Sequence, residues 1–285
     1  MTITQLCEEI GLQAEIREKI YHLTSSLDFG PLERLMDDFY DYEQARNVHT
    51  KIRAIYGEDP EGWIMLTCML YVSAASYRIY EEKGIPDRIF LDTMGCYPRF
   101  IDETQRQTGR WEFDRYWWTG RQAGSHLFRI GELEYEAKRL GGNITVGIHI
   151  PSDANLSASA VDESIHRAGQ FFETYYPEVS QSDYICHSWL MDPQLKQVLG
   201  ENSNILNFQN RFEVYDMGAE SQDYIRWIFQ TQEKNLHELA EKTSLQRNLK
   251  KFLLEGGIIY DSYGRLNMHG SAASKRQDGK SCPCP

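Results

Sequence analysis

The stretch of sequence that decides the fold is NITVGIHIPSDANLSASAVDES, residues 143–164. Its first eight residues alternate, with branched apolar side chains at every second position, as in a strand with one buried face. The strand stops at Pro151, and a run of small polar residues follows before apolar residues recur at helical spacing. This order predicts a strand that leads directly into an amphipathic helix. The apolar positions are Ile144, Val146, Ile148 and Ile150 in the strand and Val161, Ile165, Ala168 and Phe172 in the helix.

The start of this helix is a candidate anion site. Ser159 is predicted to be the N-cap, with Asp162 three residues later as its capping-box partner, and Ser157 is an alternative cap. The exposed N–H groups of a first helical turn carry a partial positive charge and suit a phosphate or pyrophosphate. Most capped helices bind no ligand, however, so the pattern by itself leaves both interpretations open.

The rest of the chain divides into two halves of different character. From residue 2 to about 121, apolar residues repeat at helical spacing, which predicts an all-helical region with one helix over 43–56 and another over 60–83. Beyond Gly120, strands and helices alternate, so the predicted fold class is α+β, with an all-α region followed by a mixed α/β sheet. The expected elements there are strands within 126–140, 143–150, 184–191 and 211–217, helices at 221–242 and 244–255, and a hairpin around 261–264. The polar end from about 271 is expected to be disordered.

Composition and charge narrow the function. The 285 residues are 41% hydrophobic and 25% charged, as in a folded globular protein. The net charge of −12 argues against a nucleic-acid-binding protein, since phosphate contacts need clustered Lys and Arg. No signal segment is evident, and the longest uncharged stretch, 62–77, is too short for a membrane helix. Because its cysteines are also scattered, the chain is expected in the cytoplasm, without nucleic-acid or membrane partners.

Five phrases of the sequence carry a family resemblance: LFRIGELEYE, HIPSDANLS, ICHSWLMDPQL, SNILNFQNRF and TSLQRNLKKFLLEGG. In this order they resemble a family of bacterial N-acyltransferase-like proteins with an all-helical N-terminal domain and a GNAT-like C-terminal domain. The resemblance covers nearly the whole chain. It implies a helical domain over 1–121, a GNAT-like domain over 122–270 and a tail over 271–285, with acetyl-CoA or a longer acyl-CoA as co-substrate.

The resemblance also implies where acyl-CoA binds. In GNAT folds the pantetheine lies where two central parallel strands splay apart, and the pyrophosphate lies at the N-terminus of the next helix. Here the strands would be 144–150 and 184–191, and the pyrophosphate loop would be 152–159. The loop departs from the family pattern Arg/Gln-x-x-Gly-x-Gly/Ala, because it has neither Gly nor Arg and carries the negative charge of Asp153. The CoA-binding residues that the resemblance implies are Ile148, Ile150, Ser157, Ala158, Ser159 and Ser188.

Acyl transfer to an amine needs a base, and His is the usual base near neutral pH. His149 lies at the carboxyl end of its strand, where ligands of parallel sheets gather, and is the candidate base; a hydrogen-bonded structural His is the alternative. Glu134 is a second catalytic candidate, although the alternating acidic residues of its strand are expected to be solvated. Tyr215 is a candidate acid for the leaving thiolate. Candidate substrate-binding residues are Glu136, His187, Asn204 and Arg211.

No metal is expected. Glu163 and His166 have the spacing of one di-iron ligand pair but lack a second pair, and the two cysteines of the Cys-Pro-Cys at 282–284 form half a metal site at most. Cys186 lies in an apolar strand, where a thiolate is disfavoured, so transfer is expected to be direct, without a covalent carrier.

The sequence thus predicts an acyl-CoA-dependent N-acyltransferase that acts on an amine of a small molecule or a protein, with the helical region covering the acceptor side. The alternative is a non-catalytic GNAT-like module that has lost the CoA loop and binds a small molecule or a protein partner. A hydrolase that uses His149 ranks third, because no nucleophile is recognisable.

Overall fold

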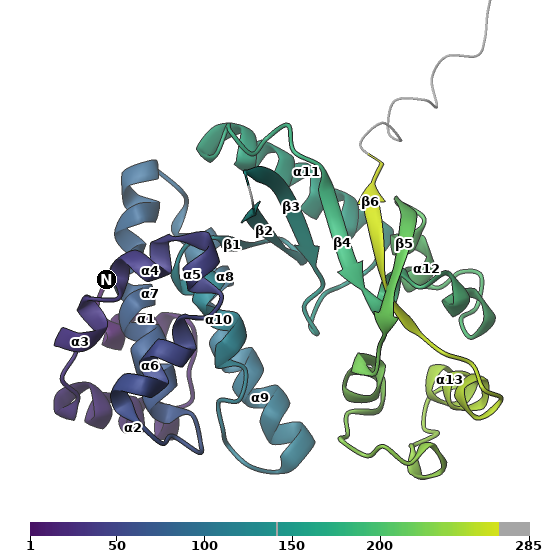
Figure 1. Cartoon of the computed structure of the whole chain (residues 1–285), viewed down its shortest axis with the longest axis horizontal. Coiled ribbons are helices and arrows are strands. Elements are labelled where there is room, and N and C mark those ends of the chain that lie inside the picture. The colour runs from purple at the N-terminus through teal and green to yellow at the C-terminus, as the bar shows by residue number, and fades with distance from the viewer. Residues whose placement is uncertain (141, 268–285) are drawn as a thin grey trace, which may run out of the picture.

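The computed structural model describes residues 1–140 and 142–267 of the chain. Its first half is helical, as the apolar periodicity predicts (Figure 1). Helix α7 contacts α1, α2, α6, α8 and α10, and it is buried on most of its circumference because these helices surround it. The helices of this half are α1 (Ile3–Glu9), α2 (Ala14–Ser26), α3 (Gly30–Glu33), α4 (Met36–Tyr40), α5 (Tyr42–Ala45), α6 (Val48–Tyr56), α7 (Trp63–Lys83), α8 (Asp87–Met94), α9 (Cys96–Thr108) and α10 (Tyr116–Ala123).

The second half contains a mixed sheet with the strand order β1-β2-β3-β4-β6-β5. Neighbouring strands are antiparallel except for β3 and β4, which are parallel and are connected through helix α11 (Ala158–Tyr175). A parallel pair requires such a crossover, because a tight turn reverses the direction of the chain and can join only antiparallel strands. The strands are β1 (Leu127–Ile130), β2 (Leu133–Leu140), β3 (Asn143–His149), β4 (Tyr184–Ser188), β5 (Phe212–Glu220) and β6 (Tyr260–Leu266), and the further α-helices are α12 (Asn204–Gln209) and α13 (Ser244–Leu254).

The two faces of the sheet meet different parts of the chain. One face lies against α11, where the hydroxyl oxygens of Tyr135 and Ser164 are 3.0 Å apart. The other face carries Glu134 and His149, which are paired across β2 and β3. This face lies toward the helical half, since Arg99 of α9 forms an ion pair with Glu134. The alternation predicted for residues 143–150 therefore separates a core face from a face toward the helices.

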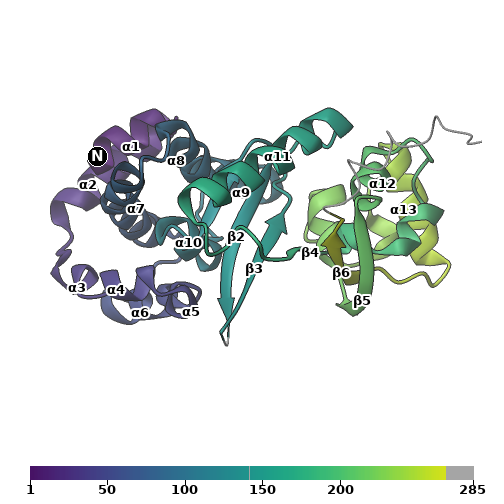
Figure 2. The ribbon, with the colours of Figure 1, turned by 90° about the horizontal axis from the view of Figure 1, so that it is seen from above.

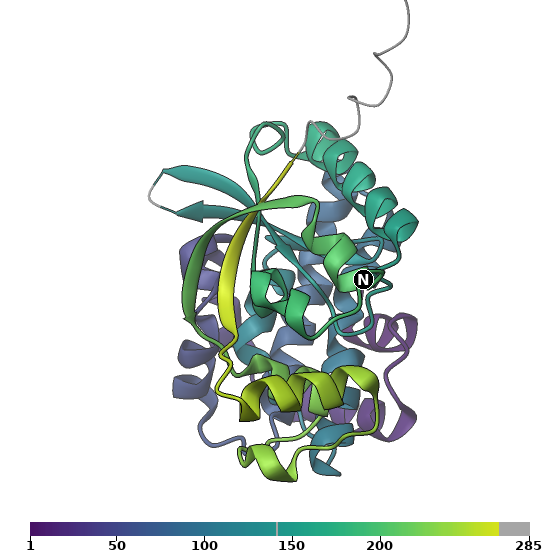
Figure 3. The ribbon, with the colours of Figure 1, turned by 90° about the vertical axis from the view of Figure 1, so that its right-hand side faces the viewer.

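The sheet opens between β3 and β4. The ladder between these strands runs from Val146 and Tyr184 to Ile148 and Cys186 and ends there. Figure 2 shows β2 and β3 next to the helical half, whereas β4, β5 and β6 lie next to α12 and α13. The apolar interior is divided in the same way. One core joins the helical half to α11 and the sheet. A smaller core includes Leu249 of helix α13. In Figure 3, helix α13 lies at the bottom of the view and helix α11 at the top.

Four predicted elements differ from the structure. The strand expected over 184–191 ends at Ser188, and a 3-10 turn follows at Trp189–Met191. The segment 221–242, expected as one helix, has a π-helical turn at Ile225–Phe229 and a 3-10 turn at Leu236–Glu238, and Gln230 between them has a φ of 52°, which an α-helix does not admit. The hairpin expected around 261–264 is part of the continuous strand β6. Its Gly264 allows close packing, because a Cβ there would lie 2.9 Å from Met191 Sδ. The helix expected over 43–56 is divided into α5 and α6.

Helix α10 packs so closely on α5 that glycine is required at their contact. A Cβ on Gly120 would lie 2.1 Å from the carbonyl oxygen of Ala45. We expect Gly120→Ala to destabilise the protein by about 1–3 kcal/mol, because the backbones must move apart. Gly169→Ala in α11 is the matched control, because a Cβ there meets no atom within 4 Å. Alanine is expected to stabilise that helix by up to about 1 kcal/mol. Urea unfolding measures the change in the free energy of unfolding for both variants. Stabilisation by Gly120→Ala as well as by Gly169→Ala would contradict the close contact at Gly120.

Several remaining predictions concern single features of the chain. Within residues 1–140 and 142–267 no helix is both long enough and apolar enough to cross a bilayer. Cys7, Cys68, Cys96 and Cys186 are buried free thiols. The predicted disordered tail, with the Cys-Pro-Cys at 282–284, lies outside the described residues.

Candidate active site

A cavity of about 1070 Å³ lies where β3 and β4 separate. Most of its wall comes from α9 and α10 of the helical half, from the ends of β3 and β4 with the segments that follow them, and from residues 223–230. Glu134 of β2, Ile205 of α12 and Asp261 of β6 complete it. Beyond Ile148 and Cys186 the facing edges of the two strands have no β3–β4 ladder partners. Ligands of open sheets bind at such points, because the strands diverge there and leave room between them.

His149 ends β3 at the cavity wall and is held from behind by a buried carboxylate. Its Nε2 lies 2.8 Å from Oε2 of Glu136, a residue that is only 2% exposed. The other carboxylate oxygen of Glu136 accepts hydrogen bonds from Nε of Arg121 at 2.8 Å and from the hydroxyl of Tyr42 at 2.9 Å. The rings of Trp118 and His149 are nearly perpendicular, with centroids 4.8 Å apart. The imidazole is therefore fixed in orientation on two sides.

The charges around Glu136 keep its carboxylate ionised. Burial by itself raises the pKa of Glu136, but the hydrogen bond and charge of His149 and the charges of Arg121 and Lys138 outweigh burial and hold that pKa well below its ordinary value of 4.5. When the imidazole of His149 is neutral, the charges of Arg121 and Lys138 remain beside Glu136, and its carboxylate can accept the Nε2 proton. The Nδ1 atom of His149 then carries the lone pair and can accept a proton.

The side chain of Lys138 reaches Glu136 across Gly147. Its Nζ is 3.8 Å from Oε2 of Glu136. A Cβ on Gly147 would lie 2.3 Å from Lys138 Cε and 3.3 Å from His149 Nε2, so the absence of a side chain at this position gives both residues their space.

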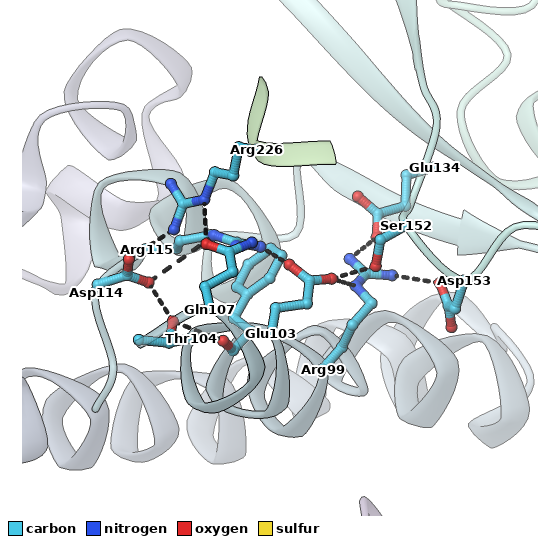
Figure 4. A network of polar contacts seen from close by, with 11 residues as sticks. Arg99, Glu103, Thr104, Gln107, Asp114, Arg115, Glu134, Ser152, Asp153 and Arg226 are labelled. Carbon is cyan, nitrogen blue, oxygen red and sulfur yellow. Dashed lines mark hydrogen bonds and ion pairs between the residues drawn. The ribbon is translucent and has the colours of Figure 1, made fainter. Parts of the chain in front are cut away.

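A polar network joins the helical half to the loop after β3 (Figure 4). Arg99 of α9 donates from Nη2 to Glu134 at 2.5 Å and from Nη1 to Asp153 at 3.2 Å. Arg129 also donates to Asp153, at 2.6 Å. Burial raises the pKa of Asp153, but the hydrogen bond from Arg129 and the charges of both arginines hold it below its ordinary value of 3.8. The negative charge that the sequence places in this loop is thus balanced by two arginines.

The same network connects two further parts of the cavity wall to α9. The hydroxyl of Ser152 donates to the carboxylate of Glu103. From the segment after β5, Arg226 donates from Nη2 to Asp114 at 2.7 Å and from Nε to Gln107 at 2.9 Å. Helix α9 therefore holds both the loop after β3 and the segment 223–230 in place beside the cavity.

Seven of the thirteen predicted site residues lie in or directly behind the cavity wall. Glu136 contacts His149 from behind, and the ring of His187 stacks on Tyr263 with centroids 3.8 Å apart. Ser188 lies at the wall, and its hydroxyl accepts from the N–H of Leu190. The predicted site residues that line the cavity are Glu134, Ile148, His149, Ile150, His187 and Ser188.

The other predicted residues lie outside the cavity wall. Arg211 donates to the Asp162 carboxylate at 2.7 Å and to the Ala158 carbonyl at 3.1 Å, so it ties α12 to α11. Tyr215 is half-exposed on the edge strand β5, beside Arg265. The full set outside the wall is Ser157, Ala158, Ser159, Asn204, Arg211 and Tyr215.

Two local predictions are corrected by the structure. Helix α11 begins at Ala158 with Ser157 as its N-cap, and the Ser157 side chain makes no capping hydrogen bond, so the capping box expected at Ser159 is wrong. The carboxylates of Glu134 and Glu136 are buried, although they were expected to be solvated, because the helical half covers their face of the sheet.

Several residues of the helical half that complete the candidate site were not predicted from the sequence. Arg99, Arg121, Tyr42 and Trp118 contact Glu134, Glu136 or His149, but they come from helices outside the sheet. The separation along the chain runs from 15 residues for Arg121 and Glu136 to 94 for Tyr42 and Glu136. Trp118 and Arg121 are three residues apart on α10, with the guanidinium 4.3 Å from the indole centroid. This helical spacing is a local signal, but nothing local indicates that the pair meets β2 and β3.

Comparison with known families explains the two halves. Residues 1–124 match the N-acyltransferase N-terminal domain, and residues 127–266 match the GNAT-like C-terminal domain. The chain belongs to the N-acyltransferase-like family that joins these two domains. This confirms the family resemblance and the α+β fold class predicted from the sequence. A search of curated proteins finds no match.

Solved structures of acyltransferases share the fold of this N-acyltransferase-like chain. One, in complex with decanoyl-CoA and teicoplanin, superposes with a TM-score of 0.73 at 23% identity. Another, in complex with CoA and 10C-teicoplanin, has a TM-score of 0.74 at 23% identity. A mutant in complex with octanoyl-CoA gives the same TM-score and identity as the second. In each case the match covers 92% of this chain and 86% of the other.

Proposed function

We propose that this protein is an acyl-CoA-dependent N-acyltransferase that transfers an acyl group directly to the amine of a small molecule or a peptide. The observation that carries the proposal is the pairing of His149 with the buried Glu136 at the point where β3 and β4 separate. A histidine whose second nitrogen is held by a carboxylate is a common arrangement for a general base. Its position in a large cavity gives the base access to a substrate.

Acyl-CoA supplies the acyl group as a reactive thioester. His149 takes one proton from the acceptor amine as the nitrogen–carbon bond forms and the carbon–sulfur bond breaks, and the departing thiolate then takes up a proton. Glu136 holds His149 in the tautomer that leaves Nδ1 as the acceptor and stabilises the imidazolium that results. Arg121 and Tyr42 position Glu136 in turn, so the helical half contributes to the base.

The thiols in the described part of the chain favour direct transfer over transfer through an acyl-cysteine. Cys186 is the thiol at the cavity wall, and burial raises its pKa to about 12. A thiol that stays protonated near neutral pH is a poor nucleophile, so a covalent acyl-cysteine step is disfavoured.

We further propose that the acyl chain is of medium length. One side of the cavity is apolar and continuous with the smaller core around α13, so it has room and surface for a hydrocarbon chain. Among the similar acyltransferases, one structure contains decanoyl-CoA and teicoplanin, one contains CoA and 10C-teicoplanin, and one contains octanoyl-CoA. A glycopeptide amine is accordingly the first acceptor to screen. The apolar wall consists of Ile150, Trp189, Leu190, Ile205, Trp227 and Ile228.

The test combines binding and turnover. Thermal unfolding with CoA, acetyl-CoA, octanoyl-CoA, decanoyl-CoA and ADP detects ligand binding, because a ligand at a hundred times its Kd adds about 2.7 kcal/mol of stability. Release of the CoA thiol in the presence of candidate amines, with mass spectrometry of the product, measures transfer. We expect larger shifts with decanoyl-CoA than with ADP, and thiol release that depends on the amine.

A non-catalytic binding module is the second candidate. The observation in its favour is the loop 152–159, which lacks Gly and Arg and holds Asp153 between two arginines. Thermal shifts with CoA esters but no amine-dependent thiol release across a broad amine panel would favour this candidate. The absence of any shift at millimolar ligand would exclude acyl-CoA as the ligand of this cavity.

A further inference from the structure

We propose that the carboxylate of Asp153 is an internal substitute for a phosphate, and that Arg99 and Arg129 bind the diphosphate of CoA when Asp153 turns away from them. The inference rests on the proposed function. It names the residues that bind the diphosphate in place of the Gly- and Arg-containing loop of the family pattern. It makes Asp153 a competitor of the co-substrate.

The geometry shows a two-arginine anion site with a carboxylate already in it. One oxygen of Asp153, Oδ1, lies 3.2 Å from Nη1 of Arg99 and 2.6 Å from Nη1 of Arg129. Two guanidinium groups converging on one oxygen form the arrangement with which proteins bind phosphate. Arg99 and Asp153 both line the cavity, next to the end of β3.

The three side chains differ in how firmly they are held. The side chains of Arg99 and Arg129 are 9% and 13% exposed, whereas that of Asp153 is 54% exposed. Arg99 is also bound to Glu134 at 2.5 Å, and Arg129 donates from Nε to the carbonyl of Gly131 at 3.2 Å. The arginines would therefore stay in place without Asp153, while Asp153 can turn into solvent.

The local charges favour the exchange. Arg99 and Arg129 bring two positive charges, and Glu134 and Asp153 bring two negative ones. Glu103, 3.9 Å from Arg99, is itself paired with Arg115, so the cluster is neutral with Asp153 in place. Removing the Asp153 carboxylate leaves one positive charge for an incoming phosphate. Ion pairs of a half-exposed carboxylate contribute little to stability, so exchange of Asp153 for a phosphate is expected to be easy.

The test measures ligand affinity by calorimetry for the wild-type protein and Asp153→Asn. We expect Asp153→Asn to bind CoA about 3- to 10-fold more tightly, because the internal competitor has lost its charge. Pantetheine, which has no phosphate, should bind equally to both proteins. Dephospho-CoA, which keeps the diphosphate but lacks the 3′-phosphate, should show the same gain as CoA. Arg129→Gln should weaken CoA binding and leave pantetheine binding unchanged.

Asp223→Asn is the matched control, because Asp223 is an exposed carboxylate elsewhere on the cavity wall. It corrects for the general effect of removing one negative charge. Unchanged or weaker CoA binding by Asp153→Asn, or an equal gain in Asp223→Asn, would overturn the inference while the proposed function stands. Loss of the gain with dephospho-CoA would overturn the assignment to the diphosphate. Failure of both the wild type and Asp153→Asn to bind CoA would instead overturn the proposed function, and this inference with it.

Discussion

His149→Ala is expected to lower kcat for amine acylation by roughly 10²–10⁴-fold, the usual contribution of a positioned general base. The acceptor amine must lose a proton as it attacks, and His149 is the cavity residue that a buried carboxylate holds in the orientation for this task. The affinity for acyl-CoA should change little, because the imidazole is assigned to the amine and not to the nucleotide. Thiol-release kinetics and calorimetry with CoA measure the two quantities separately.

His166→Ala is the control for this variant, since His166 is exposed on α11 and lies outside the cavity wall. It should retain full activity. If His149→Ala kept wild-type kcat, His149 would be a structural histidine and the proposed base would be wrong. Parallel loss of turnover and of CoA affinity would indicate a collapsed cavity and not a missing base.

Glu136→Gln is expected to lower the free energy of unfolding by about 3–5 kcal/mol, the usual cost of removing one partner from a buried ion pair. Glutamine has nearly the same shape, but it leaves Arg121 buried without a counter-charge, and Arg121 is only 7% exposed. Urea unfolding at pH 7 measures the change. Glu213→Gln is the matched control, because Glu213 is exposed on β5, and that substitution should stay within about 0.5 kcal/mol of wild type.

The difference in the free energy of unfolding between the wild type and Glu136→Gln should depend on pH. The pKa of Glu136 is lower in the folded protein than its ordinary value of 4.5, so ionised Glu136 contributes stability that is fully present above about pH 4.5 and is lost as the pH falls toward the lower folded pKa. The advantage of the wild type over Glu136→Gln should therefore begin to shrink below about pH 4.5 and continue to shrink on further acidification. Urea unfolding across this range tests the sign. An advantage that grew on acidification would show that the Glu136 pKa is raised in the folded protein.

Glu136→Gln also separates positioning from simple stability. An amide at this position offers either an oxygen or an NH₂ group to Nε2, so it no longer selects the tautomer of His149. The expected result is a lower kcat with little change in KM for acyl-CoA, measured at a temperature where the variant is fully folded. A variant that folds and keeps wild-type kcat would show that Glu136 serves stability alone.

Local patterns were enough for the fold class and for part of the site. The alternation in 143–150 and the amphipathic repeat after it predicted β3, α11 and the position of His149 at the end of its strand. These features depend on a residue and its near neighbours in the chain, because strand and helix periodicity arise from backbone geometry. The segment 221–242 was mispredicted as a helix, since its composition permits one but its packing between α9 and α13 imposes a different path.

The arrangement of the candidate site was decided by the tertiary structure alone. Whether Glu136 was solvated or buried depended on which surface of the helical half would cover β2, and the answer places it between His149 and Arg121. The charge of Asp153 was visible in the sequence, but the two arginines that neutralise it come from α9 and β1. Contacts between residues so far apart in the chain leave no local pattern, because they depend on the packing of whole helices on a sheet and not on the periodicity of either one.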